Sequence, residues 1–169
     1  MIEVVLARLD LCPMGHTGYT VILNDLAVGL QTSYLQDGNI LDLNKAIEIS
    51  QIRLDLCPLG HPEHAGAIEL LAAFLWDHYC IQKNKDDLNH LMELQKRWLV
   101  LCPLGHANHA TALGQYAGSL WECYLVEGNI TDLNMAIEMQ EKRLDLCPAG
   151  HPDNGLALAN LALSLLQRY

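Results

Sequence analysis

Apolar residues recur three or four positions apart along the chain, the spacing that gives an α-helix one buried face. Two consecutive segments carry this pattern. The first contains Leu23, Leu26, Ala27, Leu30 and Tyr34, and the second contains Leu43, Ala46, Ile47 and Leu54. The spacing predicts a first helix near residues 17–36 and a second helix near residues 41–57, with no alternating pattern typical of strands.

Short polar segments separate the predicted helices. Asp37-Gly38-Asn39 has a close copy in Glu127-Gly128-Asn129 and a weaker copy in Lys83-Asn84. Glycine and asparagine tolerate the left-handed conformation that ends a helix. Three aspartates follow these breaks, and we expect their side chains to cap the next helix: Asp42, Asp87 and Asp132.

The same features return every 45 residues. A Cys-Pro-x-Gly-His motif begins at Cys12, Cys57, Cys102 and Cys147, and tyrosines recur at Tyr34, Tyr79, Tyr124 and Tyr169. Proline disfavours helix at the residue before it, so the motif is expected to end each second helix. A fixed period of this length is typical of repeat proteins, in which each helix pair leaves an apolar side for its neighbour to cover.

These residues resemble the tetratricopeptide repeat. The opening positions of its pattern match Leu23, Leu26, Ala27 and Leu30, and its later alanine and closing proline match Ala46 and Pro58. The long unit is similar to the repeats of kinesin light chains. It is more similar still to arrays in large fungal proteins that carry a caspase-like peptidase or a nucleotide-binding signalling domain. The resemblance implies an all-α, right-handed α-α superhelix. The chain departs from the pattern where a small residue is usual, with Arg53, Trp98 and Arg143.

The period divides one expected repeat domain, residues 1–169, into five segments. Residues 14–58, 59–103 and 104–148 are predicted to be full repeats. Residues 1–13 are predicted to be the tail of a preceding repeat, and residues 149–169 the first helix of a further one. Because neither end has a polar cap, we expect a longer parent chain or self-association through the uncapped ends.

Composition narrows the functional classes. The chain has 20 acidic against 10 basic residues, a formal charge of -10. An acidic surface repels phosphate backbones, so nucleic acid is not an expected partner. The longest apolar run, Leu70–Trp76, is too short to span a membrane, and residues 1–7 lack the basic start of a signal peptide. We expect a cytoplasmic protein with reduced cysteines.

The repeated Cys-x3-His spacing raises zinc binding or thiol catalysis as an alternative function. Thiolate and imidazole are favoured zinc ligands, and a further histidine extends the set at His64 and His109. Stacked units, however, place equivalent turns about 10 Å apart, too far to share an ion. No single Cys-His pair stands out as a nucleophile and its base. We therefore expect buried cysteines, turn-forming histidines, no metal, no cofactor and no catalytic residue.

Tetratricopeptide-like stacks present their first helices on a concave side, and the resemblance implies a peptide-binding groove there. The implied groove residues are Val21, Asn24, Val28, Gln31, Thr32, Glu69, Ala73, Trp76, Asp77, Gly114, Gly118, Trp121, Glu122, Ala159, Leu163 and Leu166. Aromatic anchors beside acids are typical of peptide-binding hot spots, which favours a protein-protein interaction scaffold for a basic or apolar-basic segment. Two alternatives stay open. The first concerns the tryptophans: Trp76 and Trp121 are then core residues that fill the seam between neighbouring repeats instead of binding anchors. The second concerns the whole chain, which is then a structural spacer or oligomerisation segment.

Overall fold

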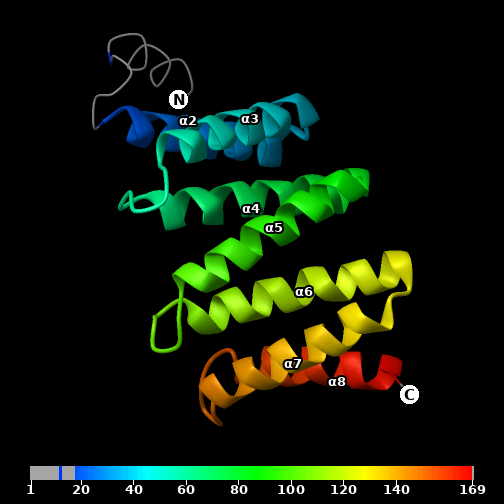
Figure 1. Ribbon diagram of the computed structural model, residues 1–169. Helices are drawn as coiled ribbons and strands as arrows, with labels where there is room; N and C mark the ends of the chain where they lie inside the picture. Colours follow the sequence, from blue (N-terminus) through cyan, green and yellow to red (C-terminus); the bar gives the residue numbers. More distant parts are fainter. Residues whose placement is uncertain (1–11, 13–17, 169) are drawn as a thin grey trace. The chain divides into compact units, whose positions relative to one another are not determined.

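The computed structural model describes Cys12 and residues 18–168, and the described residues form seven α-helices and no strand (Figure 1). The helices are α2 (Tyr19–Asp37), α3 (Ile40–Leu56), α4 (His64–Gln82), α5 (Lys85–Leu101), α6 (His109–Glu127), α7 (Ile130–Leu146) and α8 (Asn154–Arg168). The all-α prediction is confirmed. The predicted tail over residues 1–13 lies outside the described residues, except for Cys12.

Helix lengths follow a regular pattern along the chain. The first helices α2, α4 and α6 have 19 residues each and begin at residues 19, 64 and 109. The second helices α3, α5 and α7 have 17 residues each and begin at residues 40, 85 and 130. Two residues join the helices of each pair, which is enough only for a sharp reversal of chain direction.

The chain forms two compact units, residues 1–87 and residues 88–169, and their boundary falls in the first turn of α5. In the first unit α3 packs against both α2 and α4, and in the second unit α7 packs against both α6 and α8. Each unit therefore contains one complete junction, in which a second helix lies between two first helices.

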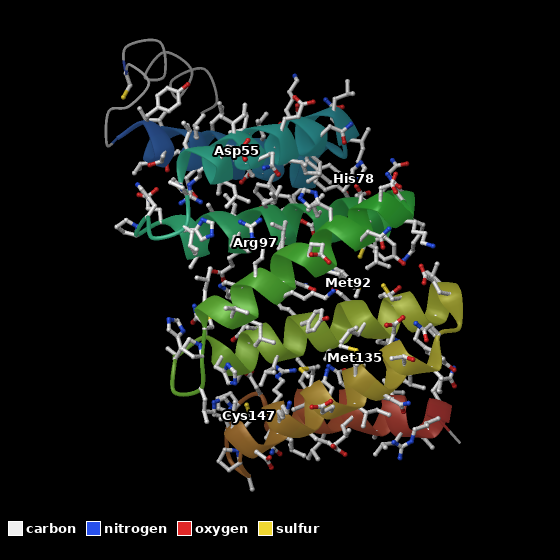
Figure 2. The ribbon with its side chains drawn as sticks, viewed as in Figure 1. Asp55, His78, Met92, Arg97, Met135 and Cys147 are labelled. Carbon is white, nitrogen blue, oxygen red and sulfur yellow. The ribbon has the colours of Figure 1, made fainter. Side chains whose placement is uncertain are left out.

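Each unit has its own apolar core. The core of the first unit joins α2, α3 and α4 through Ile22, Leu26, Ala27, Leu30, Leu43, Ala46 and Phe74. In the second unit, Tyr116 and Leu120 of α6 and Ala136 of α7 form a buried cluster. Met92 and Met135 pack against that cluster from α5 and α7 (Figure 2). Flexible methionine side chains suit such irregular gaps.

The turns within the helix pairs depend on left-handed backbone at one residue. Gly38 and Gly128 have φ values of 70° and 69°, and each donates its N–H to a tyrosine carbonyl one turn back, over 2.7 Å. Lys83 takes the same role with φ 52° although it has a Cβ, which makes this turn the strained member. The predicted breaks between helices are confirmed at these positions.

The prediction that aspartates cap the second helices is wrong. The capping oxygens belong to Asn39, Asn84 and Asn129, whose side chains each accept an N–H from the residue two positions on. Asp42 lies in the first turn of α3 and instead accepts a hydrogen bond from Ser33 over 2.9 Å. Acidic residues are also favoured in the first turn because they interact with the positive end of the helix dipole. The position of Asp42 in the sequence therefore does not distinguish a capping side chain from one that only stabilises the dipole.

Candidate functional site

The histidine of each Cys-Pro-x-Gly-His motif stabilises its own turn. Nδ1 of His61, His106 and His151 accepts the backbone N–H of the residue two positions on, over 3.1 Å in each case. The preceding glycines have φ values of 93° to 96°, a region that favours glycine. The repeated glycine and histidine therefore shape the turn that reverses the chain between repeats.

A second side chain completes each turn from seven residues beyond the cysteine. Nδ1 of His64 donates to the Cys57 carbonyl, and Nδ1 of His109 donates to the Cys102 carbonyl, both over 2.5 Å. In the turn between α7 and α8, Asn154 donates its side-chain N–H to the Cys147 carbonyl over 2.6 Å. Histidine and asparagine share this role because each can donate a side-chain N–H at similar reach. The bond satisfies a carbonyl that the ended helix leaves unpaired.

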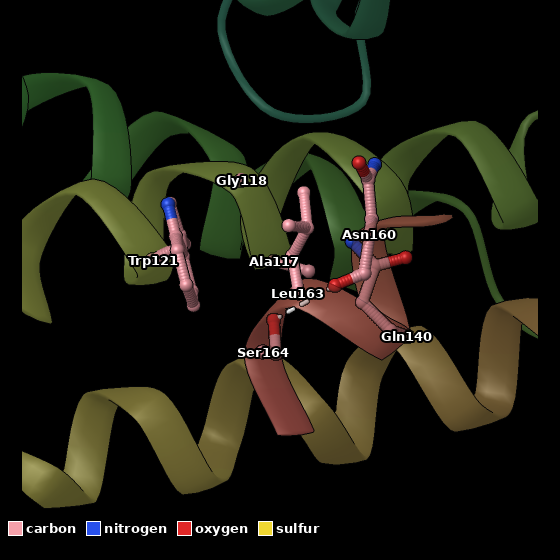
Figure 3. Close-up of a pocket in the computed structure, with 7 residues that line it drawn as sticks. All are labelled: Ala117, Gly118, Trp121, Gln140, Asn160, Leu163 and Ser164. Atoms are coloured by element: carbon pink, nitrogen blue, oxygen red, sulfur yellow. Dashed lines mark hydrogen bonds between the residues drawn. The ribbon is translucent and has the colours of Figure 1, made fainter. Parts of the chain in front are cut away.

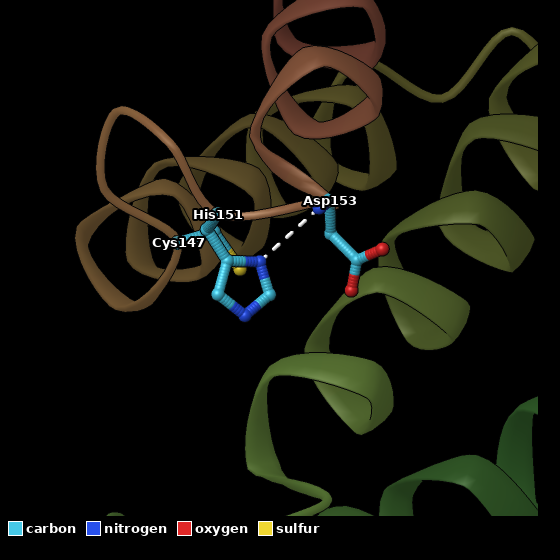
Figure 4. A group of neighbouring side chains, drawn as sticks. All are labelled: Cys147, His151 and Asp153. Carbon is cyan, nitrogen blue, oxygen red and sulfur yellow. Dashed lines mark hydrogen bonds between the residues drawn. The ribbon is translucent and has the colours of Figure 1, made fainter.

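One group of possible metal ligands is present in the described part of the chain. Ligand atoms of Cys147, His151 and Asp153 lie within 4.8 Å of one another, with Cys147 buried and the other two exposed (Figure 4). Nδ1 of His151 already accepts an N–H, and in a neutral imidazole the other nitrogen then carries the proton. A metal would have to displace that bond or that proton. The geometry favours a turn over a metal centre.

The corresponding residues of the earlier motifs are less suited to metal. Among the described residues, Cys57, His61 and His64 form no such group, and Nδ1 of His64 bonds to the Cys57 carbonyl. Burial raises the pKa of the Cys57 thiol above its ordinary value, with nearby Arg53 only partly opposing the shift. A protonated buried thiol is a weak nucleophile and a weak ligand.

The implied groove residues of the first unit lie along α2 and α4. Val28, Glu69 and Ala73 are exposed, whereas Asn24, Gln31, Trp76 and Asp77 are half-buried. Gln31 donates its side-chain N–H to the Asp77 carboxylate over 2.8 Å, which joins the two helices at this face. The structure thus brings together two of the residues that the resemblance implies.

Trp76 and Trp121 are half-buried, and each packs on a tyrosine of its own helix. The ring centroids are 6.0 Å apart for Trp76 and Tyr79, and 6.1 Å apart for Trp121 and Tyr124. Trp98, in contrast, is almost completely buried. Half-burial leaves part of each indole ring available for contact, as a binding anchor requires.

Trp121 borders a cavity of about 100 Å³ in the second unit (Figure 3). Ala117 and Gly118 of α6 line it with Trp121, and the other walls are Gln140 of α7 and Asn160, Leu163 and Ser164 of α8. Gly118 and Leu163 are among the implied groove residues. Gly114 and Glu122 are half-buried nearby on α6, whereas Leu166 is 76% exposed and does not line the cavity.

Three cavity residues, Gln140, Asn160 and Ser164, are not among the binding residues predicted from the sequence. The resemblance implies binding residues on first helices, whereas Gln140 lies on the second helix α7. One signal was present, because Ser50, Gln95 and Gln140 place a polar side chain at one repeat position, and all three are buried. The Gln140 Oε1 atom is fully enclosed and has no hydrogen-bond partner among the described residues.

The two junctions differ at the position of Ser164. Its counterpart in the first unit is Phe74, which is completely buried against α2 and α3. A benzyl group therefore occupies the space that remains open beside Ser164. The side chain at this repeat position is therefore much smaller in the second junction than in the first.

The arginines that depart from the tetratricopeptide pattern are buried. Arg53 approaches Glu63 with its terminal nitrogen 3.5 Å from the carboxylate. Arg143 packs under Gly114, where an added Cβ would lie 2.8 Å from the guanidinium carbon. Gly114 on α6 thus leaves space for the long Arg143 side chain on α7. This explains how the second unit accommodates an arginine where the tetratricopeptide pattern has a small residue.

A scan of protein-family models found no match, and neither curated proteins nor solved structures gave one. In the described part of the chain, no helix is both long enough and apolar enough to cross a bilayer.

Proposed function

We propose that this chain is a tetratricopeptide-like protein-protein interaction module that binds a peptide segment along its first helices. The observation that carries the proposal is the open cavity beside the half-buried Trp121, walled by α6 and α8 and floored by Gln140. An aromatic ring beside a small open pocket offers a partner side chain both apolar contact and a hydrogen-bonding edge. In this proposal the helix pairs continue as a right-handed superhelix with the 45-residue period, in the cytoplasm and without a cofactor.

Charge favours a basic or apolar-basic peptide. The net charge is -10, and Glu69 lies on the same face of α4 as Trp76, which follows it by seven residues. Complementary charge accelerates encounter and selects among partners more than it increases affinity. The apolar contacts at Trp76 and Trp121 are therefore expected to provide most of the binding free energy.

Peptide selection tests the proposal directly. A displayed library of random peptides is selected on the immobilised protein, and the recovered peptides are measured by isothermal titration calorimetry. Trp121→Ala is expected to weaken binding by at least about 2 kcal/mol, as for other hot-spot residues. The matched control is Leu59→Ala, which removes an apolar side chain that is 79% exposed and does not line the cavity. Failure to recover peptides, or equal affinities for wild type and Trp121→Ala with an intact helical signal, would refute the proposal.

A second candidate function is oligomerisation, which the apolar surface of α8 favours. Leu156, Leu163 and Leu166 are exposed and lie on one side of this helix, seven and three residues apart. Exposed apolar side chains that share a face are typical of contact surfaces. Sedimentation equilibrium separates the two functions. Self-association predicts a mass that rises with concentration and returns to the monomer mass in Leu156→Asp, whereas a constant monomer mass excludes it.

A further inference from the structure

Gln140 places a buried side-chain amide at the cavity beside Trp121. It lies on α7, is 3% exposed and lines the cavity together with residues of α6 and α8 (Figure 3). Its Oε1 atom is fully enclosed without a hydrogen-bond partner, and its Nε2 atom makes no hydrogen bond within residues 18–168 either. Buried polar groups in folded proteins almost always have a partner. A ligand with matching groups would therefore satisfy this amide.

The first unit has a different pair of side chains at the corresponding positions. Two periods before Gln140 and Ser164 stand Ser50 and Phe74, and both are buried. The second unit thus combines a long polar side chain on its second helix with a small one on the helix that follows. An amide at this position is absent from the first unit.

The walls of the cavity carry no charge. The residues that line it are Ala117, Gly118, Trp121, Gln140, Asn160, Leu163 and Ser164, and none of them has an ionisable side chain. A charged group that entered would lose part of its water without gaining a counter-ion, which is unfavourable. The cavity therefore favours a neutral ligand group over an ammonium or a carboxylate.

The size of the cavity suits the end of a short side chain. Its volume is about 100 Å³. A water takes up about 30 Å³ of the liquid, so the cavity has room for about three waters or a group of similar size. The half-buried Trp121 ring and the Ala117 side chain offer apolar contact to methylene groups, whereas Gln140 and Ser164 supply polar atoms. A ligand side chain with an apolar stem and a polar end matches this arrangement.

A carboxamide matches the polar atoms of the cavity. Its oxygen and its NH2 group pair with Nε2 and Oε1 of Gln140, because every primary amide offers both an acceptor and donors. Rotation about the terminal torsion of Gln140, which has a broad preference, turns Oε1 to the cavity. The Ser164 hydroxyl donates to the Asn160 carbonyl over 3.0 Å and keeps lone pairs for a second ligand N–H. A ketone of the same shape lacks the N–H and leaves Oε1 unpaired.

We infer that this cavity binds the carboxamide of a glutamine or asparagine side chain in the peptide ligand. The inference rests on the proposed function and adds a determinant of peptide sequence. The carboxamide enters beside Trp121 and pairs with the Gln140 amide. Neighbouring residues of the peptide supply its apolar and basic character.

Fragment titration by NMR tests this inference without a partner protein. Acetamide mimics the asparagine side chain, and propionamide mimics the glutamine side chain. Propionate and 2-butanone are the controls, because they have nearly the shape of propionamide but replace its NH2 group by a charged oxygen or by a methyl group. The backbone N–H signals of Ala117 and Gly118 and the indole N–H signal of Trp121 report on the cavity.

A saturable shift of these signals with the amides is the expected result. Both controls are expected to bind at least about tenfold more weakly, because each loses hydrogen bonds to the Gln140 amide. The amide that binds more tightly identifies the ligand residue as asparagine or glutamine.

Two variants remove the site in different ways. Gln140→Leu removes the amide and keeps most of the side-chain volume, and it is expected to weaken propionamide binding at least about tenfold while 2-butanone binding stays the same. Ser164→Phe fills the cavity and is expected to abolish the shifts with all fragments. Far-UV circular dichroism checks that each variant is folded.

Gln95→Leu is the matched control. Gln95 occupies the same repeat position as Gln140, is buried and has an enclosed Oε1 atom without a partner, but it does not line the cavity. This variant is expected to bind propionamide as the wild type does.

Three results would overturn the inference: no saturable shift with either amide, equal affinity for an amide and a control, or selected peptides that lack both glutamine and asparagine. The titration is independent of peptide selection. Amide binding without any selected peptide refutes the peptide module alone. Selected peptides that lose affinity in Trp121→Ala, together with no amide binding, refute the carboxamide site alone.

Discussion

Phe74 closes the junction of the first unit, and its removal is expected to reproduce there the cavity of the second unit. Phe74 is 0% exposed and packs against Leu26, Ala27, Leu30, Leu43 and Ala46. Replacement of a buried phenylalanine by alanine destabilises by about 3–5 kcal/mol, the sum of lost transfer free energy and the cavity left behind. We expect Phe74→Ala to lower the free energy of unfolding by this amount.

Ser164→Phe is the reciprocal change. The cavity beside Ser164 has a volume of about 100 Å³. At about 24 cal/mol per Å³ this corresponds to at most about 2.4 kcal/mol of stabilisation when the cavity is filled. The gain is smaller if the ring must shift Gln140 or Leu163, because overpacking strains side chains.

Urea denaturation followed by far-UV circular dichroism measures both changes, provided that the slope of the transition is unchanged. Because two compact units are present, tryptophan fluorescence is recorded in parallel to detect separate transitions. Phe74→Leu is the control, since it keeps most of the apolar volume. A loss below about 1 kcal/mol for Phe74→Ala, the effect of an ordinary substitution, would refute the comparison of the two junctions.

Three further predictions concern the turns. His64→Ala is expected to destabilise by about 1–3 kcal/mol because the Cys57 carbonyl loses its donor. His64→Asn is expected to keep most of the stability, because Asn154 makes the equivalent bond in the turn between α7 and α8; equal urea midpoints for the two variants would contradict this. Gly38→Ala is expected to cost about 1 kcal/mol at φ 70°, measured by thermal unfolding, and an unchanged melting temperature would count against the left-handed turn. The raised pKa of the buried Cys57 thiol predicts that iodoacetamide labels Cys57 more slowly than the exposed Cys80, which mass spectrometry of labelled peptides checks. It also predicts that the free energy of unfolding falls with rising pH once the Cys57 thiol ionises in the unfolded chain but stays protonated in the folded one. Urea titrations at neutral and alkaline pH check this second part.

The sequence alone was sufficient for the helices and their ends. The predicted range 17–36 became Tyr19–Asp37, and 41–57 became Ile40–Leu56. These are local properties, since apolar spacing, glycine after a helix and proline at its end act through neighbouring backbone. The exception was the cap. Asn39 and Asp42 are both acceptable near a helix start, and only the actual hydrogen bonds distinguish them.

Tertiary structure alone decided which side chains meet across helices. Arg53 and Arg143 occupy the same position of the sequence repeat. In the structure, however, Arg53 has the Glu63 carboxylate at 3.5 Å, whereas Arg143 packs under Gly114 and its Nε has no hydrogen-bond partner among the described residues. Likewise, Ser164 is a single polar residue in an apolar helix, and only the structure shows that it borders a cavity where its counterpart Phe74 is packed in the core of the first unit. Contacts between distant residues depend on side-chain length and volume within a packed junction. A periodic pattern records which face is buried and does not record what fills it.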